Sequence, residues 1–522
     1  MPNKSIDWFP VIVAIVVLFV ATVPFIYALN AGGDEYVFGG LLLNPLDGFT
    51  YLAKMYQGWE GNWRNLMAYS ADPGEGAYIN LYYLFLGHVA RVLDAPMVLV
   101  YHAARLLGSV AMLGMIWRFF GELFSDQRSQ RLAFALGAFG SGMGWIMIPF
   151  GQITSDLWVA EIYPFLSAFT NPHFPLGLTL TLWLILPQDD GPIWWQVLRR
   201  ILISVLISIV SPFGLVVVIT VLVGHFVYVF FTNQAWKDLL ILRKQFFRLL
   251  LISIAGAPLM LYYLWIAAND PIISVWNAQN LTLSPALWDL LISLSPALIL
   301  AGVGVWAFVK MEPSVKKDQA QVVLIIWLIL GLILVYIPFG LQRRFLTGLF
   351  VPLAGLAALG IEKLSLRRPK SHRFLVSVFF ILVIPTNLVV LMAGFYGART
   401  HDAKLYLSSG EAHALNWIVE NTEPDALVLS SPDMGIFIPA FTGRRVIYGH
   451  PFETVYADRE REFVENLFSD RFEITERQFM FAERGVEYVL CGPREQEISD
   501  CSEWELKVEF SDDQVLIFGL GN

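Results

Sequence analysis

Charged residues and cysteines are scarce in this sequence of 522 residues. Only 15% of the residues are Asp, Glu, Lys or Arg, against about a quarter in an average soluble protein, and 56% are hydrophobic. The two cysteines, Cys491 and Cys501, are too few for a disulfide framework, although a single disulfide between them stays an alternative. This composition excludes a soluble enzyme, a disordered chain and a nucleic-acid binder that relies on a basic surface.

Several motifs with a known mechanism are also missing. The sequence has no GxGxxG after its first strand-like run in the tail, no P-loop, no CxxC pair and no Cys/His cluster. Nucleotide binding by the tail and a zinc site therefore have no support.

The few charges are distributed unevenly along the chain. Residues 398–522 contain 11 basic and 24 acidic residues, so their net charge is −13, whereas residues 1–397 contain 24 basic and 20 acidic residues and have a net charge of +4. The overall charge of −9 thus combines two different parts. We predict a membrane-embedded domain over 1–397 and a soluble domain over 398–522.

Long apolar windows recur through the first part of the chain. The run from Phe9 to Leu29 is near the length of a bilayer span and lacks a small-residue cleavage site, which favours a retained helix over a signal peptide. We predict about eleven transmembrane helices, namely 9–29, 97–117, 132–150, 172–187, 197–211, 213–232, 248–268, 288–309, 320–337, 345–361 and 374–395.

The basic residues between these windows indicate the orientation. With the N-terminus in the cytoplasm, inner segments carry 18 Lys and Arg residues and outer loops carry five, while Arg105 lies inside a span. The chain is thus predicted to be an integral protein of a bacterial-type plasma membrane. Because eleven spans are an odd number, the tail is predicted to be extracytoplasmic.

Residues 77–93 do not fit this scheme easily. They are apolar enough for a short span, but counting them would place the basic residues of 118–131 outside and reverse the following loops. We interpret them as a helix at the outer membrane interface. A twelve-span arrangement with compensation elsewhere stays open.

The tail has the pattern of an α/β domain. A helical segment over 411–420 ends at an Asn-Thr-Glu-Pro-Asp stretch, and two closing runs around Ser-Asp-Asp suggest a hairpin. Short strand-like runs are predicted at 426–430, 445–448, 486–491, 506–510 and 514–518. Strands that alternate with helices favour a partly parallel sheet.

The first outer loop, 30–96, contains candidate site residues directly after the first helix. Acidic side chains at the mouth of a helix bundle are candidates for a general base or a metal ligand. Solvated residues at a helix end are the alternative for the first pair. The candidates in this loop are Asp34 and Glu35 as catalytic residues and Asp47, Tyr51 and Lys54 as substrate-binding residues.

Later outer loops add further candidates. Asp156 and Glu161 lie in the loop 151–172, and His173 follows at the membrane boundary, where an ordinary interfacial histidine is equally open. Arg343 and Arg344 are adjacent in a late outer turn. Arginine suits bidentate phosphate binding, although snorkelling to lipid headgroups is an alternative explanation.

Carboxylates and an arginine pair on one membrane face suit the activation of a hydroxyl and the departure of a phosphate. Nucleotide sugars are not available outside the cell, so a transferase on that face needs a lipid-carried donor. The tail segments 443–445 and 449–454 form a further polar cluster, which contacts the acceptor, caps the active site or is an ordinary loop.

At these residues the chain resembles the C-type (GT-C) polytopic glycosyltransferases, such as protein mannosyltransferases and aminoarabinose transferases. The resemblance rests on Asp34-Glu35 after the first helix, the acidic loop after the third span, the late Gln342-Arg343-Arg344 and the closing soluble domain. It implies a hexosyltransferase with Asp34 as general base, a lipid-phosphate site at the arginine pair, and Lys54 and His173 in support.

The implied partners are a polyprenyl-phosphate sugar as donor, a glycan, lipid or protein hydroxyl as acceptor, and membrane lipid, without nucleic acid. No tight DxD motif occurs in the loops, so no cofactor is assigned and a divalent cation stays open. A transporter or flippase of a lipid-linked substrate, and a non-catalytic assembly or sensor protein, are the alternative functions.

Overall fold

A computed structural model describes residues 7–187, 191–232, 239–310, 318–366, 369–469, 471–512 and 514–520. The chain forms two compact units. Unit 1 comprises Met1–Pro24, Ala103–Tyr262 and Thr282–Gly394, and unit 2 comprises Phe25–His102, Tyr263–Leu281 and Phe395–Asn522. Residues of the first long loop and of the tail therefore belong to the same unit, while the predicted boundary at 397/398 stays a prediction.

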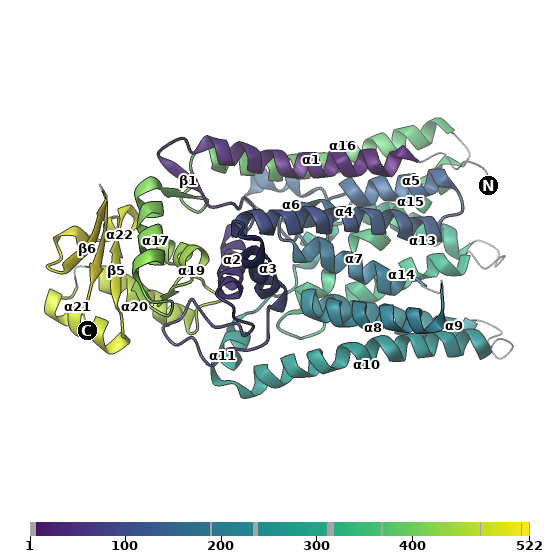
Figure 1. Cartoon of the computed structure of the whole chain (residues 1–522). Helices are drawn as coiled ribbons and strands as arrows, with labels where there is room; N and C mark the ends of the chain where they lie inside the picture. Colours follow the sequence, from purple (N-terminus) through teal and green to yellow (C-terminus); the bar gives the residue numbers. More distant parts are fainter. Residues whose placement is uncertain are drawn as a thin grey trace. The chain divides into compact units, whose positions relative to one another are not determined.

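Unit 1 is helical (Figure 1). Four long helices contribute residues to both units: α1 (Trp8–Ala31), α4 (Met97–Leu123), α10 (Leu239–Asn269) and α16 (Pro369–Arg399). The other α-helices of unit 1 are α5 (Gln127–Phe139), α6 (Pro164–Phe169), α7 (His173–Ile185), α8 (Ile193–Val210), α9 (Pro212–Thr232), α12 (Leu287–Ser293), α13 (Ala297–Val309), α14 (Asp318–Val335) and α15 (Phe350–Ser365). Its short 3-10 helices are η1 (Gly144–Ile146), η2 (Ile148–Phe150), η3 (Ser155–Leu157) and η5 (Gln342–Leu346).

Within the described ranges, eight helical segments are long and apolar enough to cross a membrane, or nine if the bent pair α12 and α13 is one span. The most apolar window of α10 has a mean hydropathy of 2.0, yet only 11% of it is buried in the protein. Such a surface is stable against lipid and not against water. The chain is therefore an integral membrane protein.

All eleven predicted windows contain helix, but three of them are not continuous α-helices. The window 345–361 begins in η5, and α15 starts only at Phe350. In the window 132–150, helix α5 ends at Phe139 and short 3-10 turns follow. In the window 288–309, α12 and α13 meet at an angle of 82° near Pro296, because a proline disfavours helical conformation in the preceding residue. Helices α7 and α14 are short, and the count of eleven stays a prediction.

Unit 2 contains short helices that come from three separate parts of the chain. They are α2 (Pro45–Trp59), α3 (Leu81–Leu93), α11 (Pro271–Gln279), α17 (Ser409–Asn421), α18 (Pro432–Gly435), α19 (Phe437–Thr442), α20 (Ala457–Phe468), α21 (Ile474–Arg484), α22 (Pro493–Gln496) and η6 (Cys501–Glu503). At 13 residues, α3 measures about 20 Å at 1.5 Å per residue, which is less than the roughly 30 Å of a bilayer core.

Helices α2 and α3 pack closely against each other. A side chain at Gly58 of α2 would collide with the carbonyl of Leu84, and one at Gly87 of α3 would collide with the carbonyl of Met55. The two glycines thus allow backbone contact, which fixes α2 firmly. Pro45 occupies the first turn of α2, where its fixed backbone angle favours helix initiation.

The tail forms a five-stranded sheet in the order β4-β3-β5-β7-β6. Strand β3 is parallel to β4 and β5, and β7 is antiparallel to β5 and β6. The strands are β3 (Leu427–Leu429), β4 (Arg445–Val446), β5 (Tyr488–Cys491), β6 (Lys507–Asp512) and β7 (Val515–Gly519). The predicted α/β tail with a partly parallel sheet and a closing hairpin is confirmed.

Two features of unit 2 join distant parts of the sequence. Strand β1 (Tyr36–Phe38) pairs antiparallel with β2 (Tyr406–Ser408), so the first loop and the start of the tail share a small sheet. Cys491 and Cys501 form a disulfide, with their Cα atoms 5.9 Å apart. It links the end of β5 to η6.

Candidate functional site

Three of the predicted site residues lie on one face of α2 in unit 2. Asp47, Tyr51 and Lys54 are spaced by four and three residues, which places them above one another on a helix. The opposite face carries Phe49, and its side chain is fully buried. The amphipathic pattern of α2 therefore presents a carboxylate, a phenol and an ammonium group in one row.

Asp47 is held in position while part of it stays accessible. Its side chain is 43% exposed, and its Oδ2 accepts a hydrogen bond of 2.5 Å from the Asn44 amide. Nε2 of His450 lies 3.5 Å from its Oδ1. Asp47 also lies in the first turn of α2, where the helix dipole favours a negative charge. These contacts orient the carboxyl group.

The tautomer of His450 follows from its other nitrogen. Nδ1 accepts hydrogen bonds from the backbone N–H groups of Phe452 and Glu453, at 3.0 and 3.1 Å. An acceptor nitrogen carries no proton, so the proton of the neutral ring is on Nε2, the atom that faces Asp47. His450 is 2% exposed and therefore acts as a fixed partner of this carboxylate.

Lys54 is buried, and its ammonium group forms an ion pair with Glu453 at 2.8 Å. It also donates a hydrogen bond of 3.3 Å to Thr50. The ring of Tyr51 stacks on Tyr83 of α3, with 4.2 Å between the ring centroids. The predicted binding residue Lys54 thus connects α2 to the tail loop 449–456.

We expect Lys54→Met to lower the free energy of unfolding by about 3–5 kcal/mol, because it leaves the mostly buried carboxylate of Glu453 without its partner. Combining it with Glu453→Leu should restore part of this loss. Thermal unfolding in detergent measures the effect. The exposed pair Arg461–Glu465 is a matched control, and Arg461→Met should cost less than about 1 kcal/mol. Equal losses in both variants would contradict a structural role for the buried pair.

The loop 449–456 is itself fixed by α11. The side-chain amide of Gln279 donates to the carbonyls of Phe452 and Thr454, and its oxygen accepts from the N–H of Tyr456. The loop is thus anchored within unit 2, and both a role at the acceptor and an ordinary loop stay predictions. His450 and Glu453 come from a position some 400 residues after their partners, and no local pattern in the sequence could link them.

Asp34 and Glu35 lie in the turn between α1 and β1, and both are exposed. Their backbone carbonyls accept hydrogen bonds from Ser409, through its hydroxyl and its N–H. Their carboxylates make no interaction within the described part of the chain that would join them to Asp47. The predicted catalytic role of this pair is untested by these contacts and stays a prediction.

In unit 1, Asp156 lies in η3 and is fully buried. Its carboxylate accepts hydrogen bonds from the N–H of Gly144 at 2.8 Å and from the hydroxyls of Thr154 and Ser293 at 2.6 and 3.1 Å. Burial raises the pKa of Asp156, and these three hydrogen bonds oppose the increase. The side chain is thus engaged by the loop and by α12.

Asp289 of α12 completes this network. It accepts hydrogen bonds from the N–H and the hydroxyl of Ser155, at 2.8 and 2.7 Å. At 2.6 Å it also shares with Asp156 the single proton of the Ser293 hydroxyl. Tyr163 donates to the carbonyl of Ser293 at 2.5 Å. The network fixes the loop 144–163 against the bend after α12. Sequence reasoning missed Asp289 and Ser293, because they look like ordinary residues of an apolar helix.

Glu161 and Arg343, both predicted site residues, do meet in unit 1. Nε of Arg343 lies 3.7 Å from Oε1 of Glu161, and its guanidinium carbon lies 4.5 Å from the ring centroid of Trp158. The side chains of Glu161 and Arg343 are 11% and 21% exposed. A guanidinium stacked on an aromatic ring is held in one plane, which suits bidentate binding of an anion.

Arg344 and His173 have different neighbours. The guanidinium of Arg344 lies 5.7 Å from the ring of Phe213, and its buried Nε has no hydrogen-bond partner in the described part of the chain. His173 begins α7 and its ring packs against Phe174. In the described ranges, no group of three or more His, Cys, Asp or Glu side chains is arranged to hold a metal ion. The question of a divalent cation stays open.

A second polar group in unit 2 joins Arg444, which belongs to the polar cluster of the tail noted in the sequence, to Glu60, which was not predicted. Glu60 follows α2, and its Oε1 lies 3.6 Å from Nη1 of Arg444. Burial raises the pKa of Glu60 from 4.5 to about 7, and the charge of Arg444 opposes this increase. A glutamate that follows an amphipathic helix gives no sequence signal for such a partner.

The Glu60 carboxyl should make stability depend on pH. An acid whose pKa is raised in the folded chain binds more protons when folded, so the free energy of unfolding falls as the pH rises from 4.5 to about 7. Arg444, Tyr56 and Arg91 are the other ionisable groups around this carboxyl. None of the three reverses the sign, because the positive charge of Arg444 is already included in the raised pKa.

We expect Glu60→Gln to raise the free energy of unfolding by about 1–2 kcal/mol at pH 8, after allowance for solvent screening, and to leave it unchanged at pH 4. Thermal unfolding across this pH range measures the difference. Glu423→Gln, at an exposed position of the same unit, is the matched control and should change stability by less than about 0.5 kcal/mol at either pH. The same pH profile in both variants would contradict the raised pKa.

Comparisons with known proteins concern the fold. No protein-family model matches the sequence, and no curated protein is similar to it in sequence. The apo oligosaccharyltransferase of Archaeoglobus fulgidus is similar in structure, with a TM-score of 0.57 and 14% identity over 93% of this chain and 70% of that one. ArnT from Cupriavidus metallidurans bound to undecaprenyl phosphate has a TM-score of 0.50 and 11% identity over 97% and 98% of the two chains.

The archaeal enzyme is also similar in its complex with an inhibitory peptide and dolichol-phosphate, with a TM-score of 0.52 and 14% identity over 93% of this chain and 70% of that one. The helical membrane part and the α/β unit thus define a polytopic membrane protein of the C-type glycosyltransferase fold. At these identities the similarity establishes the fold and leaves the reaction to be argued from the residues.

Proposed function

We propose that this protein is a hexosyltransferase that moves a sugar from a polyprenyl-phosphate donor to a hydroxyl of a glycan, lipid or protein at the outer membrane face. The observation that carries the proposal is the fold, which extends over more than nine tenths of the chain. One similar structure contains an inhibitory peptide and dolichol-phosphate, and another contains undecaprenyl phosphate. These ligands are consistent with a lipid-phosphate donor here.

The proposed reaction is a single displacement. A carboxylate takes the proton of the acceptor hydroxyl, whose oxygen forms a bond to the anomeric carbon of the sugar. The bond between that carbon and the phosphate oxygen breaks, and polyprenyl phosphate leaves with the electron pair. The products are the glycosylated acceptor with inverted configuration, polyprenyl phosphate and a protonated carboxyl group.

We assign the general base to Asp47 and keep Asp34, the residue that the sequence favours, as the alternative. Asp47 is supported by its partial exposure, the hydrogen bond from Asn44 and the Nε2–H of His450 that faces it. A general base needs a fixed orientation as well as access to substrate. Asp34 has the access, but no described side chain orients it.

The leaving phosphate is assigned to Arg343, with Arg344 in support. Arg343 has a guanidinium plane fixed by Trp158, and a fixed positive charge stabilises the developing negative charge without reorganisation. Glu161 is close enough to keep this arginine in place and leaves part of its side chain exposed.

The outer location of the reaction rests on two observations. Basic residues are concentrated in the loops that are predicted to be cytoplasmic, and the tail contains the disulfide Cys491–Cys501. Disulfides persist in oxidising compartments and are rare in the cytoplasm. Both observations favour an extracytoplasmic tail.

The transporter alternative gains little support from Arg105, the arginine inside a predicted span. Arg105 is 1% exposed in α4, and Nη1 donates to the carbonyls of Ala168 and Ala21, at 2.6 and 3.4 Å. An arginine that binds backbone carbonyls of neighbouring helices has a structural role. Intramembrane charges in transporters commonly lie along a substrate pathway.

The decisive experiment is sugar transfer in proteoliposomes that contain the purified full-length protein. A set of radiolabelled polyprenyl-phosphate hexoses is supplied with a membrane extract as the source of acceptors. Transfer of label from at least one donor, with release of polyprenyl phosphate, is the expected result. Transport of the intact lipid across the bilayer without cleavage would overturn the proposal.

A further inference from the structure

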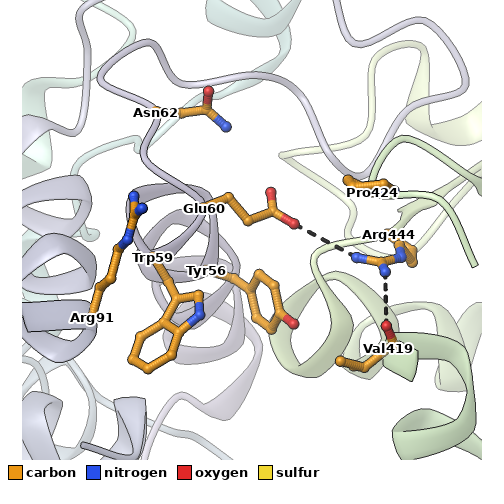
Figure 2. Close-up of a pocket in the computed structure, with 8 residues that line it drawn as sticks. All are labelled: Tyr56, Trp59, Glu60, Asn62, Arg91, Val419, Pro424 and Arg444. Carbon is orange, nitrogen blue, oxygen red and sulfur yellow. Dashed lines mark hydrogen bonds and ion pairs between the residues drawn. The ribbon is translucent and has the colours of Figure 1, made fainter. Parts of the chain in front are cut away.

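Unit 2 contains an open pocket of about 580 Å³ between the end of α2 and the segment around Arg444 (Figure 2). Tyr56 and Trp59 of α2 line it together with Glu60, Asn62 and Arg91. Its volume is in the range of sites that hold small organic ligands. None of these residues belongs to the proposed base or to the phosphate site.

Arg444 is a fixed wall of this pocket. Its Nε donates to the hydroxyl of Thr422 at 2.9 Å, and its Nη atoms donate to the carbonyls of Thr442, Val419 and Thr422 at 2.9, 3.1 and 2.7 Å. At 4% exposure it cannot turn toward a ligand. Four of its five N–H groups are therefore committed to the protein.

Glu60 is left with unused hydrogen-bonding capacity. Its distance of 3.6 Å from Arg444 is too long for a hydrogen bond, and its carboxyl accepts none within the described residues. Gly443 allows this approach, because its φ is +73° and an added side chain would meet the ring of Tyr56 at 2.5 Å. The result is a half-buried carboxyl, 24% exposed, that faces an open pocket.

The aromatic residues give the pocket an apolar side. Tyr56 and Trp59 are three residues apart on α2 and therefore neighbours on its surface. Figure 2 shows their rings beside Glu60, with Arg91 and Arg444 on opposite sides of that carboxyl. Asn62 adds an amide, which can both donate and accept. The pocket thus combines aromatic faces with a rim of a carboxyl, an amide and a guanidinium group.

This combination fits a sugar ring better than other small ligands. A pyranose has apolar C–H faces that pack on aromatic rings and hydroxyls around its edge that both donate and accept. An alkyl chain would leave Glu60 unsatisfied, and a phosphate attracted by Arg91 would still meet the negative charge of Glu60 above its pKa of about 7. An ammonium group would lie close to Arg91. We infer that this pocket binds a neutral sugar residue of the acceptor, with the ring on Trp59 and hydroxyl groups donating to Glu60.

The inference narrows the acceptor to a glycan and, in that respect, rests on the proposed function. Binding itself is independent of turnover and is measured first. The purified full-length protein in detergent is titrated with neutral trisaccharides of glucose, mannose, galactose and N-acetylglucosamine, and binding is followed by saturation-transfer NMR and tryptophan fluorescence. Inorganic phosphate is the competing probe.

We expect at least one trisaccharide to bind, with affinity reduced at least tenfold in Trp59→Ala and in Glu60→Gln. Trp63→Ala is the matched control, because Trp63 is 48% exposed and stacks on His88 outside the pocket lining. Its affinity should equal that of the wild type. The inference would be overturned if no sugar binds, if phosphate binds in place of all four sugars, or if Trp59→Ala binds sugar with unchanged affinity.

The transfer assay separates this inference from the proposed function. In Trp59→Ala we expect the KM for the glycan acceptor to rise at least tenfold while kcat changes less than threefold. Sugar binding without any transfer would refute the proposed function and keep the pocket. Transfer with an unchanged acceptor KM would refute the pocket and keep the function.

Discussion

Asp47→Asn is expected to reduce kcat for sugar transfer by 10²- to 10⁴-fold, the usual contribution of a positioned general base. The substitution keeps the size of the side chain, and the oxygen of the new amide can still accept from the Asn44 amide, while its NH2 group takes the position 3.5 Å from Nε2 of His450, where no hydrogen bond is lost. The fold should therefore be retained, and the KM for the donor should change little. Initial rates with a labelled donor, together with thermal unfolding of the same samples, measure both expectations.

The matched control is Asp34→Asn, which changes the same functional group in the same unit. If Asp47 is the base, this variant should keep turnover within about threefold of the wild type, because an exposed carboxylate away from the reacting atoms contributes little. Loss of turnover in Asp34→Asn with normal rates in Asp47→Asn would return the role to the residue that the sequence favours. Equal rates in all three proteins would exclude both carboxylates.

Much of the fold was predictable because the membrane imposes a strong and simple pattern. A span needs about 20 apolar residues, and each of the eleven predicted windows contains helix. The strands of the tail were predictable as short apolar runs between charged helices. The bend at Pro296 was predictable from its proline. The break after Phe139 was not, since hydropathy reports the presence of apolar residues and not the continuity of a helix.

The candidate site was predictable only where its residues are close in sequence. Asp47, Tyr51 and Lys54 follow helical spacing, so the sequence alone is enough to group them. His450 and Glu453 meet Asp47 and Lys54 through long-range packing of the tail loop, and neither has a distinctive local motif. The same holds for Asp289, which binds Ser155 across 134 positions.

The role of Arg343 can be tested by removing its charge and by changing its shape separately. Arg343→Ala is expected to lower kcat by 10²- to 10³-fold, because the departing phosphate loses a fixed positive charge. Arg343→Lys should give a smaller loss, since an ammonium keeps the charge but lacks the planar fork and the stacking on Trp158.

A phosphate site at Arg343 also predicts an effect on the product. Polyprenyl phosphate should inhibit the wild type, and its inhibition constant should rise at least tenfold in Arg343→Ala, because the product retains the phosphate that this arginine binds. Lys310→Ala is the matched control. Lys310 also lies over a tryptophan in unit 1, with 4.6 Å from its Nζ to the ring centroid of Trp306. It belongs, however, to a segment predicted to be cytoplasmic. If Arg343→Ala loses thermal stability but is inhibited as strongly as the wild type, this arginine is only a structural partner of Glu161 and Trp158. If its charge contacts the leaving phosphate, turnover and product affinity must fall together.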